Sequence, residues 1–172
     1  KTKFFEGDAA AIVYNKADAK MRQQLRENQR TREYFDDEAH PATWELARKH
    51  PKRTQIWRMR MGIMPTGDFI NELGMEDDMG GVCMCGTRDD PEEETLRHIL
   101  MDCRLYEDLR IPDTPTMREA LGYVAQGDYS QGNNLEERKK RARKRMDAAW
   151  KIWCERNRLR AMAKARMEDQ DE

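Results

Sequence analysis

The chain has 172 residues, of which 38% are charged and 38% hydrophobic, and its mean hydropathy is -1.07. This length fits one domain, or one domain with arms, and the small apolar share predicts a thin core spread over long helices and supported by a metal or a cross-link. No run is apolar enough to cross a bilayer and no signal peptide is recognisable, although a chain that begins at Lys1 fits a fragment or a processed form whose leader has been removed.

The formal net charge of -1 hides two segments of opposite charge. Residues 68–94 contain ten acidic side chains and one basic side chain, whereas residues 135–166 contain thirteen basic side chains and four acidic ones. A basic stripe is the electrostatic footprint of polyanion binding. The second segment is therefore a candidate for binding nucleic acid, with pairing between the two segments as the competing interpretation.

Residues 1–40 are expected to form an N-terminal helical arm, because apolar side chains recur at three- and four-residue steps after Asp8, which suits an N-cap. The arm contains YFDD at residues 34–37, a match to the Y-x-D-D catalytic signature of reverse transcriptases. That chemistry needs two carboxylates on a tight hairpin between apolar strands. The flanking segments RTRE and EAHP are too polar to form such strands, so we interpret YFDD as a solvated helix end.

Residues 41–125 are expected to form a helical module stabilised by zinc. Its predicted helices cover 41–50, 52–61, 68–74, 95–101 and the segment TMREALG. The first begins with a proline at its first turn, and the third ends at Gly74, a suitable C-cap. The second carries Arg53, Arg58 and Arg60, which are candidate contacts for nucleic acid.

The segment CMCGTRDDPEEETLRHILMDC, residues 83–103, predicts a metal centre. The candidate ligands have the spacing C-x-C-x12-H-x4-C and are Cys83, Cys85, His98 and Cys103. Zinc prefers four thiolate or imidazole ligands in a tetrahedron, and the neighbouring glycines permit the chain to turn between the first two cysteines. Because protein fills all four positions, the predicted Zn²⁺ is structural and leaves no open position for a catalytic water.

Two alternatives to zinc stay open at this point. Cys83 or Cys85 could form a disulfide with Cys103, or the cysteines and the histidine could be neighbours in sequence by chance. The fourth cysteine, Cys154, lies near two tryptophans in the last predicted helix and is expected to be a buried thiol.

Residues 126–172 are expected to form a loop, a long basic helix from Leu135 to Met167 and an acidic tail. The helix has no Gly or Pro, which favours continuity, and its apolar stripe predicts that Trp150 and Trp153 dock in the core rather than stack on bases. Residues 138–145 are expected to project outward. The candidate nucleic-acid contacts in this run are Lys139, Lys140, Arg141, Arg143, Lys144 and Arg145. The same run is also typical of a solvated helix face or a nuclear-import signal.

The cysteine-rich segment and its surroundings resemble a known family. The pattern CxCG…ETLRHILMDCRLY, preceded by RTQIWRMRMGIMPTGDFINELG, is similar to the zinc-binding C-terminal region of non-LTR (LINE-type) retrotransposon polyproteins, which follows their reverse transcriptase. The resemblance covers about residues 45–125, with Glu94, His98, Cys103 and Tyr106 in matching positions. Met61, Gly62 and Ile63 replace the usual Thr-Gly-His of the lead-in.

The resemblance implies a module that handles nucleic acid, carried by a retroelement or by a gene derived from one. It carries over Cys83, Cys85, His98 and Cys103 as metal ligands and carries over no catalytic residue. We therefore expect a mostly α-helical, non-catalytic chain with one zinc knuckle, which binds RNA or DNA in the nucleus and has no small-molecule substrate. The alternative is a protein-interaction module, such as a secreted fungal pathogen effector that acts in the host nucleus or cytoplasm. A weaker third option is an accessory to a nuclease or polymerase.

Overall fold

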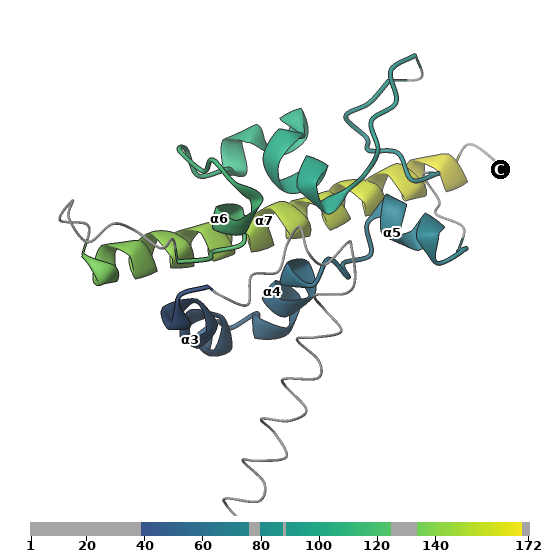
Figure 1. The fold of residues 1–172 in the computed structure, drawn as a ribbon. Helices are drawn as coiled ribbons and strands as arrows, with labels where there is room; N and C mark the ends of the chain where they lie inside the picture. Colours follow the sequence, from purple (N-terminus) through teal and green to yellow (C-terminus); the bar gives the residue numbers. More distant parts are fainter. Residues whose placement is uncertain (1–38, 76–79, 88, 125–133, 170–172) are drawn as a thin grey trace, which may run out of the picture.

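The computed structural model describes residues 39–75, 80–87, 89–124 and 134–169 (Figure 1). In chain order the elements are α3 (Pro41–Lys49), α4 (Arg53–Arg60), α5 (Gly67–Glu72), the π-helical turn η1 (His98–Asp102), the 3-10 helix η2 (Arg104–Leu109), α6 (Met117–Ala120) and α7 (Leu135–Glu168). Within these ranges, extended pairing is limited to one isolated antiparallel bridge between Val82 and Glu93. The predicted mostly helical fold with a long C-terminal helix is confirmed. The expected N-terminal arm, with its YFDD match, lies outside the described residues.

The long helix α7 is the spine of the structure. It lies between α3 and α4 on one side and η1, η2 and α6 on the other (Figure 1). Its first turn is capped by Asn134, whose side chain accepts a hydrogen bond from the Glu136 N–H at 3.0 Å, as expected for an asparagine N-cap. Over 34 residues it contains neither Gly nor Pro. No described helix is both long and apolar enough to span a bilayer.

The buried stripe of α7 agrees with the sequence pattern through Trp153 but includes two arginines and does not continue to Met162, which is exposed. Its buried residues are Arg138, Ala142, Met146, Ala148, Ala149, Ile152, Trp153 and Arg156. Trp153 docks in the core as predicted, and Trp150 is partly buried with the Lys52 ammonium 5.7 Å from its ring centre. The prediction that residues 138–145 all project outward is wrong for Arg138, which is only 9% exposed. It is buried because it lies four residues before Ala142, on the same helical face.

Aromatic rings hold α3 and α4 together and against the segment that follows α6. Trp44 of α3 and Trp57 of α4 stack with ring centres 5.4 Å apart. Tyr123 meets Trp44 edge-on at 5.8 Å. Both arrangements suit the charge distribution of aromatic rings. At the start of α3 the His40 ring accepts the Ala42 N–H at 3.1 Å, a capping role that the sequence pattern did not suggest.

Arg60 is a core residue and not a surface contact. It is 0% exposed, and its guanidinium donates to the carbonyl oxygens of Leu121 at 3.0 and 3.2 Å, Gly122 at 3.1 Å and Thr43 at 3.3 Å. It also lies 4.6 Å from the ring centre of Tyr123. The prediction that Arg60 contacts nucleic acid is therefore corrected, because every face of its guanidinium is directed into the protein. Its charge is matched by carbonyl dipoles and ring faces.

Candidate metal centre

A short hairpin presents the first two cysteines. The Cys83 N–H donates to the Glu92 carbonyl at 2.7 Å, and the Glu94 N–H donates to the Gly81 carbonyl at 2.9 Å. Gly81 has a φ of +80°, in the left-handed region that glycine adopts without steric cost. Beyond Cys83 the chain turns back through a Gly86 N–H bond to the Cys83 carbonyl at 3.0 Å, which places Cys83 and Cys85 on either side of a tight turn.

A π-helical turn presents the other two ligands. The Cys103 N–H donates to the His98 carbonyl at 2.7 Å, an i to i+5 bond. In an α-helix, residues five apart point about 140° away from each other. A π turn holds more residues, so a residue five positions on returns to nearly the same face. The x4 spacing between His98 and Cys103 is therefore explained by a π turn that ends at Cys103. The sequence had predicted an ordinary helix over 95–101.

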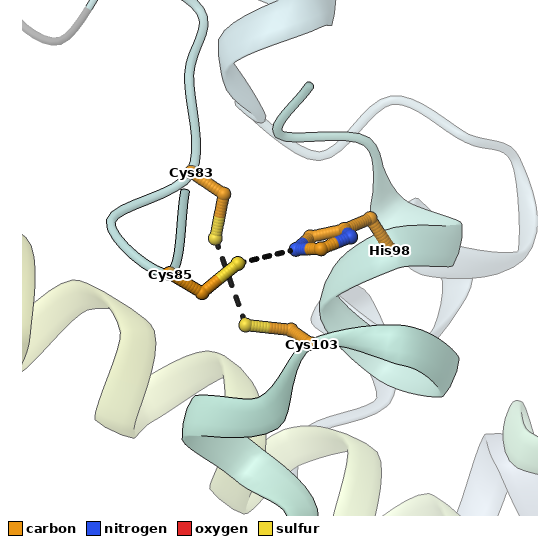
Figure 2. Close-up of side chains that lie close together, drawn as sticks. All are labelled: Cys83, Cys85, His98 and Cys103. Carbon is orange, nitrogen blue, oxygen red and sulfur yellow. Dashed lines mark hydrogen bonds between the residues drawn. The ribbon is translucent and has the colours of Figure 1, made fainter. Parts of the chain in front are cut away.

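The four predicted ligands converge at one point (Figure 2). All four ligand atoms, from Cys83, Cys85, His98 and Cys103, lie within 4.8 Å of one another. The Cys83 and Cys103 sulfurs are 3.6 Å apart, and the Cys85 sulfur lies 3.1 Å from His98 Nε2. Two sulfurs that share a tetrahedral zinc ion are about 3.8 Å apart, given Zn–S bonds of about 2.3 Å. The cysteines are all free, and the Cys83–Cys103 separation is too long for a disulfide.

The cluster is buried but reaches solvent on one side. The three cysteines are 0–6% exposed and the His98 side chain is 12% exposed. A cleft of about 180 Å³ borders Cys85 and His98, whereas Cys83 and Cys103 lie deeper. This side offers a metal ion a path to the ligands, and the protein's own donors fill all four directions around the centre.

The charges around the cluster suit a metal that binds thiolates. Burial raises the pKa values of the Cys83 and Cys103 thiols above their ordinary range, so both are protonated at neutral pH without a metal. Arg104 donates to the Cys85 carbonyl, and Arg110 donates to the Cys103 carbonyl. A zinc ion with three thiolates and an imidazole carries a net negative charge, which these guanidinium groups offset. The donor set and its surroundings therefore fit Zn²⁺.

His98 has a carboxylate near the ring nitrogen that faces away from the cluster. Its Nδ1 lies 3.8 Å from the Glu92 carboxylate, which is longer than a hydrogen bond. Metal-bound imidazoles commonly have a carboxylate on this side of the ring. Because Nε2 is the atom that faces Cys85, the ring is already turned toward the cluster.

The predicted cationic contacts fall into three groups. Exposed side chains are Arg53, Arg58, Lys140, Arg141, Arg143 and Lys144. Lys139 is partly exposed and pairs with Glu136 at 2.8 Å, and Arg145 is held against α6 by Glu119 at 3.1 Å and by the Asp113 carbonyl at 2.7 Å. Arg60 is the third case, buried as described above. Most of the basic run on α7 therefore lies on the surface, whereas Arg145 is held against α6 and Arg60 of α4 is buried.

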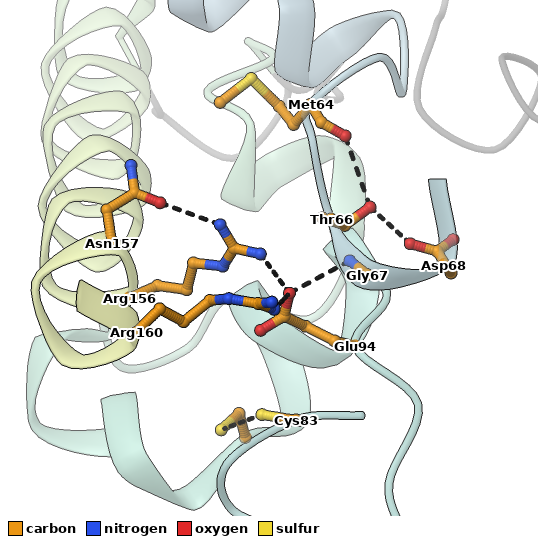
Figure 3. A network of polar contacts seen from close by, with 10 residues as sticks. Met64, Thr66, Gly67, Asp68, Cys83, Glu94, Arg156, Asn157 and Arg160 are labelled. Carbon is orange, nitrogen blue, oxygen red and sulfur yellow. Dashed lines mark hydrogen bonds and ion pairs between the residues drawn. The ribbon is translucent and has the colours of Figure 1, made fainter. Parts of the chain in front are cut away.

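Sequence reasoning missed a buried carboxylate beside the metal cluster. Glu94 is 0% exposed, accepts the Gly67 N–H at 3.1 Å and pairs with Arg156 and with Arg160, the latter at 2.6 Å (Figure 3). It is the last of three consecutive glutamates at 92–94, a run that is typical of a solvent-exposed loop. No local signal could have found it, because an extended chain points Glu92 to the same face as Glu94 and yet Glu92 is exposed.

Two further assignments change. His50, to which the sequence gave no role, is buried and its Nε2 lies 2.9 Å from the Asp147 carboxylate of α7. Cys154, expected to be a buried thiol, is exposed. It lies one residue after the buried Trp153, and one step along a helix turns a side chain by about 100°.

Fold and site together define an α-helical chain in which a buried Cys₃His cluster could hold a metal ion. No family model, no curated protein and no solved structure matches it. The resemblance to retrotransposon zinc regions therefore stays a prediction from the sequence pattern.

Proposed function

We propose that this chain is a non-catalytic, zinc-stabilised helical module of retroelement origin that binds the phosphate backbone of nucleic acid and acts in the nucleus. The observation that carries the proposal is a set of exposed cations on α7. Lys140, Arg143 and Lys144 are exposed and have no ion-pair partner among the described residues. Partnerless cations on one rigid helix are available to neutralise phosphates.

Two of these cations, Lys140 and Lys144, share a face with a third, Lys151. At about 100° per residue, Lys140, Lys144 and Lys151 lie within about 40° of one another on α7 and point away from its buried stripe. Lys151 is exposed as well. Their spacing along the axis, about 1.5 Å per residue, gives a stripe roughly 16 Å long. That length is enough to contact several successive phosphates of one strand.

The aromatic residues favour backbone contact over base stacking. Within the described ranges, the exposed large hydrophobic side chains include no aromatic ring. Trp44 and Trp57 stack on each other, and Trp153 is buried. Proteins that read single strands by stacking need exposed rings. Sequence-independent binding is therefore the proposed mode.

The proposed absence of catalysis has support at the metal cluster. Four protein ligands surround it, and catalytic zinc sites keep a position for water or substrate. The zinc there would supply a cross-link for a chain with a thin core. Zinc-dependent hydrolysis of nucleic acid by the purified chain would contradict this part of the proposal.

A test of the nucleic-acid proposal is fluorescence anisotropy with labelled duplex DNA and single-stranded RNA over a range of salt. The triple variant Lys140→Gln, Arg143→Gln, Lys144→Gln should weaken binding and lower the salt slope by about 2 to 3, since each phosphate contact contributes about 0.7–0.9. A matched control removes three exposed cations elsewhere, Arg48, Lys49 and Arg118. Equal losses in both variants, or no binding by the wild type, would remove nucleic acid as the partner.

A protein-interaction module is the second candidate, and one feature favours it. An open groove of about 380 Å³ lies between η1, the segment after η2 and α7, and is lined by both apolar and charged side chains, including Leu100, Ile111, Ile152 and Arg145. Grooves of this kind accept side chains of a partner. If the wild type fails to bind nucleic acid at low salt, this second function replaces the first.

A further inference from the structure

The buried carboxylate of Glu94 joins three parts of the molecule. It follows the hairpin that carries Cys83, accepts a hydrogen bond from the first N–H of α5, and receives two guanidinium groups from α7 (Figure 3). Arg156 is 5% exposed and the Arg160 side chain 13% exposed. Two guanidinium groups and one N–H converge on one oxygen of the carboxylate, so the group carries one net positive charge, and removal of Glu94 would leave two arginines without their buried anion.

Backbone bonds tie Glu94 to the metal ligands. The Glu94 N–H bonds to the Gly81 carbonyl, and the Cys83 N–H bonds to the Glu92 carbonyl. These two bonds lie on either side of the bridge between Val82 and Glu93. The position of Glu94 is therefore set by the same hairpin that directs Cys83 and Cys85 into the cluster. A change in that hairpin moves the carboxylate with it.

Tyr106 is a buried residue close enough to both the cluster and the carboxylate to interact electrostatically with them. It is 0% exposed, and its hydroxyl has no hydrogen-bond partner among the described residues. Burial, reinforced by the charges of Cys83, Cys103 and Glu94, raises the pKa of Tyr106. The cluster cysteines, Tyr106 and Glu94 are all buried, and Cys83, Cys103 and Tyr106 belong to one core.

We propose that metal binding at the Cys₃His cluster controls the seating of the C-terminal half of α7, with Glu94 as the connecting group. With zinc bound, the hairpin is fixed and Glu94 holds Arg156 and Arg160. Without zinc, four ligand side chains lose their common partner, the hairpin loosens, and the two arginines lose their buried anion. The N-terminal half of α7 stays in place because α3, α4 and α6 pack on it through contacts that do not involve Glu94, including His50 with Asp147.

Hydrogen exchange on the full chain tests this coupling. The zinc-loaded protein, with zinc content measured by elemental analysis, is compared with the same protein after chelation. We expect amides of residues 150–165 to exchange about tenfold faster or more after chelation, and amides of residues 138–146 to change far less. Faster exchange confined to residues 80–110, with 150–165 unchanged, would overturn the proposal.

Glu94→Gln separates the connecting role from metal binding itself. The amide keeps an oxygen for the Gly67 N–H and loses the charge that holds the two arginines. We expect this variant to bind one zinc ion per chain and yet to show fast exchange at 150–165 with zinc present. Glu93→Gln is the matched control, since the neighbouring Glu93 is exposed and its loss should leave the exchange pattern as in the wild type.

Arg160→Lys keeps the experiment decisive if Glu94→Gln does not fold. The lysine keeps the positive charge but loses the guanidinium group that donates to Glu94. Amide hydrogen exchange at 150–165 should therefore be faster than in the wild type and slower than in Glu94→Gln. Wild-type exchange in this variant would overturn the proposal. The inference rests on the metal-binding part of the proposed function only. A chain that contains no zinc would refute that part directly, whereas a chain that binds zinc without protecting α7 would refute this inference alone.

Discussion

The two sides of α7 bury charge in opposite ways. On the metal-bearing side, defined by the hairpin at 80–95 with η1, η2 and α6, the buried anion Glu94 is met by two arginines of α7. On the tryptophan side, formed by α3 and α4, the buried cation Arg60 meets no carboxylate of the described residues and is held by carbonyl oxygens and the Tyr123 ring. One side depends on a charge pair and the other on dipoles.

This difference teaches how each side responds to damage. The charge pair on the metal-bearing side needs its partner on α7, so it fails when either element moves. Arg60 has several donors and several carbonyl partners, and burial lowers its pKa to about 10, which still leaves it charged at neutral pH. Its hydrogen bonds hold the residues that follow α6, Leu121 and Gly122, against α4. We expect the metal-bearing side to open first and the tryptophan side to persist.

The largest expected effect comes from Cys103→Ser, which tests the metal-bearing side. Loss of one buried ligand should remove zinc and lower the free energy of unfolding by roughly 3 to 5 kcal/mol, a fraction of the ~10–16 kcal/mol that structural zinc supplies in small metal-dependent domains. Chemical denaturation and elemental analysis measure both. Cys154→Ser makes the same chemical change at an exposed site and should have no effect. A zinc content that survives Cys103→Ser would show that the cluster is not the binding site.

The tryptophan side is tested by Arg60→Met. The thioether has a similar length and cannot donate, so the carbonyl oxygens of Leu121, Gly122 and Thr43 lose their donors. We expect a loss of about 3 kcal/mol, at roughly 1 kcal/mol or more for each unsatisfied buried carbonyl. Zinc content should stay at the wild-type level, because the cluster lies on the other side of α7. Unchanged stability in denaturant would mean that the guanidinium bonds contribute little.

The pH dependence of zinc affinity sharpens the comparison further. The metal-free thiols of Cys83 and Cys103 have raised pKa values, and the bound form carries thiolates. Zinc binding therefore releases protons, and affinity rises with pH, by about tenfold per pH unit for each proton released. Isothermal titration calorimetry in buffers of different ionisation enthalpy counts these protons between pH 6 and 8. An affinity that does not depend on pH in this range would exclude thiol ligands.

The smallest expected effect is that of Thr43→Val. The Thr43 hydroxyl is buried and accepts the Val124 N–H at 2.9 Å. Valine has the same shape without the oxygen, so one buried N–H is left without its acceptor. A loss of about 1 to 2 kcal/mol is expected, measured by thermal unfolding. Thr54→Val, at an exposed position of α4, is the control and should change stability by less than about 0.5 kcal/mol.

The elements that could be predicted are those whose signal is local. α7 was found almost to its last residue because its apolar stripe and its lack of Gly and Pro span the whole helix. The Cys₃His cluster was found because ligand chemistry restricts which side chains can gather and at what spacing. Both patterns are complete within a short stretch of chain.

The parts that could not be predicted depend on distant partners. Arg60 stands among exposed arginines in RTQIWRMR, and it becomes a core residue through distant partners such as the carbonyl of Leu121, which is 61 positions away. Glu94 reads as one acid among several, and its burial depends on Arg156, which is 62 positions away. No local pattern distinguishes a buried charge from a solvated one when its partner comes from elsewhere in the fold.

The position of α7 in the chain has a consequence for synthesis on the ribosome. The four metal ligands lie within residues 83–103, so they can close around an ion as soon as that stretch has emerged. The partners on α7 emerge much later, since His50 must wait for Asp147, 97 positions on. Until then the apolar faces of α3, α4 and α6 lack the helix that covers them. If a metal binds, folding should therefore begin with local closure of the Cys₃His cluster and finish with the late docking of α7. Until α7 docks, the nascent chain exposes apolar surface and needs protection against aggregation.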